Sequence, residues 1–165
     1  MSGSDSDPAV RTDGVHDKVR SLWVPLRDMN LLLPGVVVVE IGAYRTPREV
    51  PGMPEWLLGM VKWRKREVAV VSLESLCGLG APTNPVFSRL MIVNSMLPDS
   101  RVEFYAIVTA GLPGLIQFGN DSVARVDVYD MQGVHCVVQV GNERAVIPDL
   151  VYLQGLLAEC LAQAA

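Results

Sequence analysis

The sequence lacks the motifs on which most catalytic and metal sites depend. Its 165 residues contain two histidines and three cysteines, and no Cys-x-x-Cys pair occurs. No P-loop, His-Glu-x-x-His, Gly-x-Ser-x-Gly or Gly-x-Gly-x-x-Gly motif is present, and no two acidic residues have a spacing that indicates an acid–base couple. We therefore expect a protein that is not an enzyme and that has no catalytic residues, no metal and no other cofactor.

Long apolar runs and a strong charge of one sign are missing as well. No apolar run reaches the roughly 20 residues that a membrane-spanning helix needs, and residues 1–13 lack the apolar segment of a signal peptide. The formal net charge is −4, which gives nothing global to attract nucleic acid or an anionic membrane. We expect a cytoplasmic protein without direct membrane insertion and without a nucleic-acid partner.

The cysteines are few and far apart. Cys77, Cys136 and Cys160 are odd in number, which argues against a disulfide framework. His135 precedes Cys136, but neighbouring side chains of a strand point to opposite faces, so these two residues could not form a catalytic dyad. Buried, unreactive thiols are the favoured interpretation. A thiol enzyme that uses Cys136 or Cys77 is kept as an alternative.

The residues that are present indicate one β-rich domain with a helix at its end. Half of the residues are apolar, which is ample for a core. Residues 1–18 are polar and are expected to be a disordered tail, and 19–165 form the domain. The expected strands are 22–26, 30–33, 36–41, 59–64, 67–73, 89–94, 102–110, 115–118, 124–129, 134–140 and 144–147. Helices are expected at 74–79 and, with a leucine stripe and Asp149 as N-cap, at 150–164.

Residues 31–73 carry the most information. The β-branched run 36–41 is expected to be a strand that is buried or nearly so. Three prolines in 46–54 exclude a regular helix or an inner strand there. A hairpin with its turn at Lys65-Arg66 should follow. Its second strand should bury Val70 and Leu73 and should belong to the same small barrel as the strand 36–41. Four cations lie within five residues, at Lys62, Arg64, Lys65 and Arg66.

The cations of this hairpin have three interpretations. They could contact nucleic-acid phosphates, they could be a solvated hairpin tip, or they could belong to a protein-interaction surface, in which arginine and tryptophan are favoured. Trp63 is the one aromatic residue among them, and the net acidic chain makes a poor groove for nucleic acid.

The same residues resemble the CheW-like domain, the adaptor of bacterial chemosensory arrays. Val38-Val39-Glu40-Ile41 matches the family's valine-x-glutamate-isoleucine segment, and residues 53–59 match its proline loop and glycine. Gly59 and Arg64 keep the glycine-to-arginine spacing of its glycine-x-x-asparagine-leucine-arginine-glycine motif. The resemblance spans about residues 20–160. The departures from the family pattern are Lys62, Trp63, Lys65, Ala69 and Ser72.

The resemblance implies an all-β fold of two intertwined five-stranded SH3-like barrels with a C-terminal helix. It implies a non-catalytic adaptor that couples the cytoplasmic tips of methyl-accepting chemoreceptors to a CheA-type histidine kinase, at membrane-bound receptor arrays. The departures indicate a divergent member, similar to the accessory adaptors of systems that control type IV pili and twitching motility. The partner-binding residues that it implies are Val38, Glu40, Gly59, Lys62, Trp63 and Arg64.

Two of these positions have an expected structural role. The guanidinium of Arg64 should fix the hairpin by charge-assisted hydrogen bonds, with Glu40 as one candidate partner. Gly59 should allow a backbone conformation or a close approach that a side chain would block. The alternative function is a β-barrel module that binds nucleic acid or a small ligand through the basic hairpin 62–66.

Overall fold

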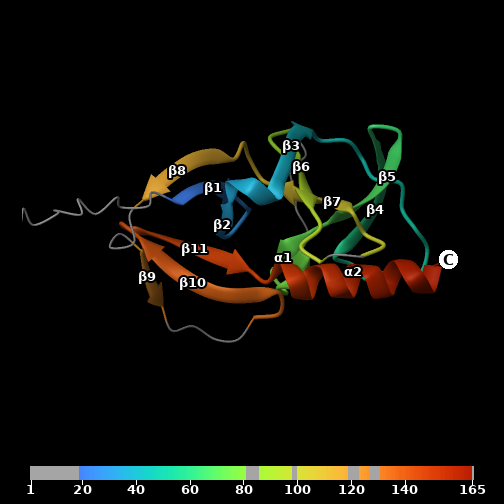
Figure 1. Ribbon diagram of the computed structural model, residues 1–165. Helices are drawn as coiled ribbons and strands as arrows, with labels where there is room; N and C mark the ends of the chain where they lie inside the picture. The colour runs from blue at the N-terminus through green and yellow to red at the C-terminus, as the bar shows by residue number, and fades with distance from the viewer. Residues whose placement is uncertain (1–18, 81–85, 98–99, 119–122, 127–130, 165) are drawn as a thin grey trace, which may run out of the picture.

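The strands of the protein form two sheets that lie side by side (Figure 1). The computed structural model describes residues 19–80, 86–97, 100–118, 123–126 and 131–164. The expected tail, 1–18, lies outside these residues. The six-stranded sheet has the order β8 (Gly114–Phe118), β1 (Val19–Pro25), β2 (Asn30–Pro34), β11 (Glu143–Pro148), β10 (Val134–Val140) and β9 (Val123–Val126). The five-stranded sheet has the order β3 (Val38–Ala43), β6 (Arg89–Asn94), β7 (Phe104–Thr109), β5 (Arg66–Val71) and β4 (Leu57–Trp63).

The chain builds the six-stranded sheet from both of its ends. Strands β1 and β2 come first, the middle of the chain forms the other sheet, and β8 to β11 then return. The early and late strands of this sheet are joined by β2, which pairs in parallel with β11 through Leu31 and Val146. The predicted all-β fold of two intertwined β bodies with a C-terminal helix is confirmed. One of the two sheets has six described strands instead of five, since β8 adds to β1 and β9 adds to β10.

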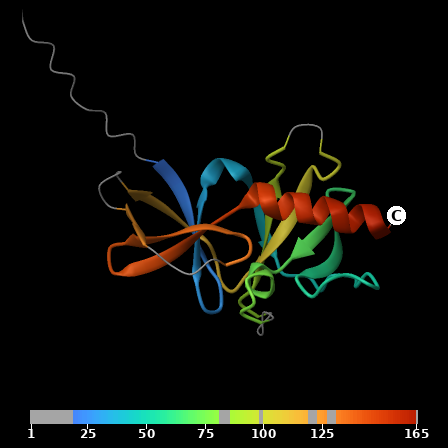
Figure 2. The ribbon, with the colours of Figure 1, turned by 90° about the horizontal axis from the view of Figure 1, so that it is seen from below.

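Helix α2 (Leu150–Ala164) covers the main core (Figure 2). Its leucines at 150, 153 and 157 are buried in a cluster that also contains residues of both sheets. Asp149 accepts a hydrogen bond from the backbone N–H of Tyr152, at 2.9 Å, which is the predicted N-cap contact. The apolar stripe and the cap were both visible in the sequence, and the predicted bounds of this helix are correct.

Three local predictions need correction. The run 36–41 is not one buried strand, because Gly35–Val37 forms a 3-10 turn (η1) that takes the chain from one sheet to the other, and Val36 is 86% exposed. The hairpin turn lies at Arg64-Lys65, one residue earlier than expected, with φ of 47° and 63° at these residues. Both φ values are positive, as in the two-residue turns that match the twist of a hairpin. The short helix α1 is Leu73–Leu76, since Ser72 caps its start.

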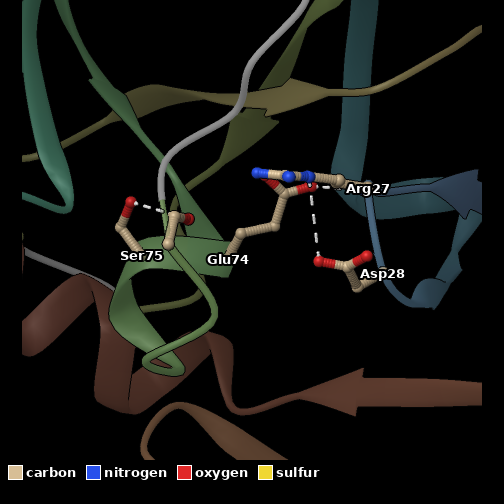
Figure 3. Close-up of polar contacts among 5 residues, drawn as sticks. Arg27, Asp28, Glu74 and Ser75 are labelled. Carbon is tan, nitrogen blue, oxygen red and sulfur yellow. Dashed lines mark hydrogen bonds and ion pairs between the residues drawn. The ribbon is translucent and has the colours of Figure 1, made fainter.

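A buried carboxylate joins the two sheets (Figure 3). Glu74 lies on α1, directly after the five-stranded sheet, and is 3% exposed. Its Oε1 accepts the backbone N–H of Arg27, in the β1–β2 turn, at 2.5 Å. The Arg27 Nε is 3.9 Å from a carboxylate oxygen of Asp28. Burial raises the pKa of Glu74 above its ordinary value of 4.5, although the bond from Arg27 opposes this effect.

We predict that Glu74→Gln stabilises the protein near neutral pH. The raised pKa means that the folded state binds the Glu74 proton more tightly than the unfolded state does. Glu74 therefore contributes most to stability below pH 4.5, and this contribution is lost as pH rises through the folded-state pKa. Glutamine keeps an acceptor for Arg27 and has no charge to desolvate. In urea unfolding, the advantage of the variant over the wild type should grow from pH 4 to pH 7, and an advantage that shrinks would contradict this account.

Candidate functional site

Glu40, Trp63 and Arg64 meet where the two edges of the five-stranded sheet approach each other. The indole N–H of Trp63, on β4, donates to Oε2 of Glu40, on β3. The Arg64 Nη2 lies 3.5 Å from Oε1 of the same carboxylate. The ion pair with Glu40, which was one candidate contact predicted for Arg64, is therefore present. Because β3 and β4 are the two outer strands of this sheet, the carboxylate of Glu40 links its two edges, as expected of a sheet that curves toward a barrel.

A backbone contact also joins the two edges of the sheet, and we call the line along which β3 and the segment after it meet β4 the seam. The segment that follows β3 returns to β4, where Arg48 and Met60 exchange two backbone hydrogen bonds of 2.8 and 2.9 Å. Gly59 makes this approach possible, because a Cβ on it would lie 2.2 Å from the carbonyl oxygen of Arg48. Its φ of 142° is also one that residues with side chains rarely adopt. The close approach predicted at Gly59 is thus confirmed.

Trp63 is a core residue rather than an exposed anchor. Its side chain is 7% exposed and lies in a cluster with Val61, Val68 and Val70. Its ring meets the ring of Phe104 edge-on, with centroids 5.0 Å apart. The guanidinium carbon of Arg64 lies 4.6 Å from the Trp63 centroid. Trp63 therefore contacts Glu40 through its N–H and Arg64 through its ring, while its own surface is almost entirely covered.

The arginines near the hairpin are paired with carboxylates. The Arg48 Nη2 lies 3.0 Å from Glu67, and Arg66 forms an ion pair with Glu103. With the pair of Arg64 and Glu40, each of these three arginines has an acidic neighbour. The pairs are half-exposed, so each contributes little to stability. They do reduce the positive field that a nucleic-acid phosphate would meet.

The other predicted site residues lie around this centre. Lys62 and Lys65 are exposed, and neither makes an ion pair with any residue that the structure describes. Val38 is not brought into the cluster of Glu40, Trp63 and Arg64. It starts β3 half-buried and packs against the main core beneath the sheets. The predicted burial of Val70 and Leu73 is confirmed, and β3 and β5 belong to one sheet, although Leu73 begins α1.

A second surface feature was missed by the sequence reasoning. Met96 and Leu97, in the β6–β7 turn, are 44% and 37% exposed, and Val151 on α2 is 50% exposed. The turn lies against the helix, because the N–H of Met96 donates to Oε1 of Gln154 at 2.7 Å. Val151 lies one helical turn before Gln154, so the two residues are neighbours on the surface of the helix. We call Met96, Leu97 and Val151 the apolar patch. Its signal in the sequence was two large apolar residues between the expected strands 89–94 and 102–110.

The thiols give no support to a thiol enzyme. Cys77 donates its S–H to the carbonyl oxygen of Gln132 at 3.3 Å, and burial raises its pKa. Burial also raises the pKa of Cys160. A reactive cysteine needs the opposite shift, toward thiolate. His135 is exposed while Cys136 is half-buried, as expected for neighbours on a strand.

Within the described ranges, no three histidine, cysteine or acidic side chains come together in a way that could hold a metal ion. No helix in the described part of the chain is long and apolar enough to cross a membrane.

The fold defines a class of β proteins in which the chain passes from one sheet to a second sheet and back, and comparison with known proteins gives that class a name. The CheW-like domain matches residues 20–154, so the chain belongs to this family. The crystal structure of the scaffolding protein TtCheW from Thermoanaerobacter tengcongensis is similar, with a TM-score of 0.69 and 17% sequence identity. The match covers 82% of this chain and 92% of that chain, and it shows a shared fold. No curated protein sequence matches the chain.

We predict that Gly59→Ala destabilises the protein by about 2–5 kcal/mol, since it adds a steric clash to an unfavourable φ. The matched control is Gly42→Ala, on the other edge strand of the sheet, where a Cβ would meet no atom within 4 Å. This control should change the free energy of unfolding by less than about 1 kcal/mol. Chemical denaturation of the two variants measures both values. Equal effects at Gly59 and Gly42 would show that the Arg48 carbonyl does not constrain the seam.

Proposed function

We propose that the protein is a non-catalytic chemosensory adaptor that couples methyl-accepting chemoreceptors to a CheA-type histidine kinase. The observation that carries this proposal is the convergence of the family's motif positions on one seam. Gly59, Arg64 and Glu40 are separated in sequence, yet they close the same sheet and leave one carboxylate–guanidinium pair half-exposed. An adaptor of this kind couples its partners as a rigid body, because each partner's state then biases the binding of the other.

The seam is the proposed surface for the kinase. Glu40 and Arg64 keep 43% and 61% of their side-chain surface exposed, so both can still contact a partner. The covered ring of Trp63 fixes their positions, which lowers the entropy that binding must cost. Lys62, exposed on the same strand, can add a contact with an acidic residue of the kinase.

The apolar patch is the proposed surface for the receptor. A helical partner binds by placing apolar side chains of one face against an apolar surface, and we propose that the receptor tip binds in this way. Met96, Leu97 and Val151 offer such a surface beside α2. Seam and patch lie on different elements, which allows one adaptor to hold both partners.

The alternative, binding of nucleic acid through hairpin 62–66, has less support. Such a module needs cations that are free to meet phosphates. In this hairpin, Arg64 and Arg66 are engaged by Glu40 and Glu103. Salt-dependent binding of a single-stranded oligonucleotide at physiological ionic strength would favour this alternative over the adaptor.

We predict that Arg64→Ala weakens binding of the kinase regulatory domain by about 1–3 kcal/mol, since a charged hydrogen bond at the interface is lost. Lys65→Ala, the next residue of the same turn, is the matched control and should change binding by less than about 1 kcal/mol. Isothermal titration calorimetry with the purified domain measures both. The variants should keep the circular dichroism spectrum of the wild type, because the exposed Arg64 pair adds little stability. Abolished binding in Lys65→Ala with normal binding in Arg64→Ala would place the kinase surface elsewhere.

A further inference from the structure

Gln154 is a fully buried polar side chain on the face of α2 that packs into the core. It is 0% exposed, and its helical neighbours Leu153 and Leu157 are also 0% exposed. A primary amide gains little from the hydrophobic effect at such a position. Burying it without hydrogen-bond partners would lower the stability of the fold by several kcal/mol. Its retention there therefore requires specific partners.

Each polar atom of Gln154 has a partner in the turn between β6 and β7. Its Oε1 accepts the N–H of Met96, and its Nε2 donates to Oγ of Ser95 and, at 3.3 Å, to the carbonyl oxygen of Val102. Ser95 and Met96 begin this turn and Val102 lies near its end. One side chain of the helix thus holds both ends of the turn.

The hydrogen bonds continue to the apolar patch. The hydroxyl of Ser95 accepts a hydrogen bond from the side-chain amide of Gln154. It also donates to the carbonyl oxygen of Leu97 at 2.8 Å and accepts the N–H of Leu97 at 3.2 Å. Gln154 therefore reaches Met96 directly and Leu97 through Ser95. The strands below do not need this connection, because β6 and β7 pair along their whole length, from Arg89 with Thr109 to Asn94 with Phe104.

We infer that Gln154 is a positioning residue for receptor binding, which fixes Met96 and Leu97 in the conformation that the receptor tip meets. This inference rests on the proposed function and adds a specific role to a residue that lies outside the family's motif. Without these hydrogen bonds the turn samples other conformations, and the receptor binds only the fraction that retains the present one. The apparent affinity for the receptor is then the intrinsic affinity multiplied by that fraction, whereas we expect the contacts of Glu40 and Arg64 to be unaffected.

The test uses Gln154→Met, which keeps the length and approximate volume of the side chain and removes every hydrogen bond. Gln163→Met is the matched control, because Gln163 is exposed on the same helix. We expect Gln154→Met to lower the affinity for a purified receptor cytoplasmic fragment at least tenfold and to change the affinity for the kinase regulatory domain less than threefold. The amide of Met96 should exchange its hydrogen at least tenfold faster in this variant, with the amides of β7 unchanged. Gln163→Met should behave as the wild type in all three measurements.

Two results would overturn the inference. Receptor binding within twofold of the wild type would show that Gln154 does not position the patch, and an equal loss for both partners would show a general structural role. If Gln154→Met does not fold, Ser95→Ala removes the hydroxyl between Gln154 and Leu97 and should reduce receptor binding selectively. A wild-type protein that binds neither partner would instead contradict the proposed function, and that result is separate from any difference between variants.

Discussion

The closure of the five-stranded sheet is the constraint on which the rest of the structure depends. An open sheet of this size would leave the edges of β3 and β4 free, and free edges invite pairing with other chains. Here the carbonyl oxygen of Arg48 accepts a hydrogen bond from the backbone N–H of Met60 on β4, and this approach is possible because Gly59 has no Cβ. The carboxylate of Glu40 then joins the two edges through Trp63 and Arg64. Closure and the half-exposed charged pair are therefore one feature of the molecule.

Rigidity links this closure to the proposed coupling. The buried contact of Glu74 with the Arg27 backbone ties the closed sheet to the other sheet, and α2 packs against both. Gln154 extends the same body to the β6–β7 turn. A body held at these points can transmit a bias between two partners, because a change at one surface is not absorbed by movement within the adaptor.

Local patterns in the sequence predicted a strand-rich body with a terminal helix, whereas the two intertwined barrels and the expected site positions were implied by the resemblance to the CheW-like domain. The glycine and arginine five residues apart, the Glu40 segment before the proline loop and the leucine stripe of 150–161 were each readable without a structure. Val36 was misjudged, since a β-branched run looks the same in a strand and in a turn that links two sheets. The alternation of side chains along a strand places Trp63 on the same buried face as Gly59 and Val61. The cations that flank Trp63 had indicated a surface position instead. The role of Gln154 could not be predicted, because its partners lie 52 to 59 residues away in sequence.

The central claim is that one rigid adaptor binds a receptor and a kinase at the same time through different surfaces. Sedimentation velocity on the wild-type protein, mixed with a purified receptor cytoplasmic fragment and the regulatory domain of the kinase, tests it most directly. The account predicts a complex that contains all three components and that sediments faster than either pair. If saturating receptor fragment displaced the kinase domain from the adaptor, the two surfaces would be one, and the account would be contradicted.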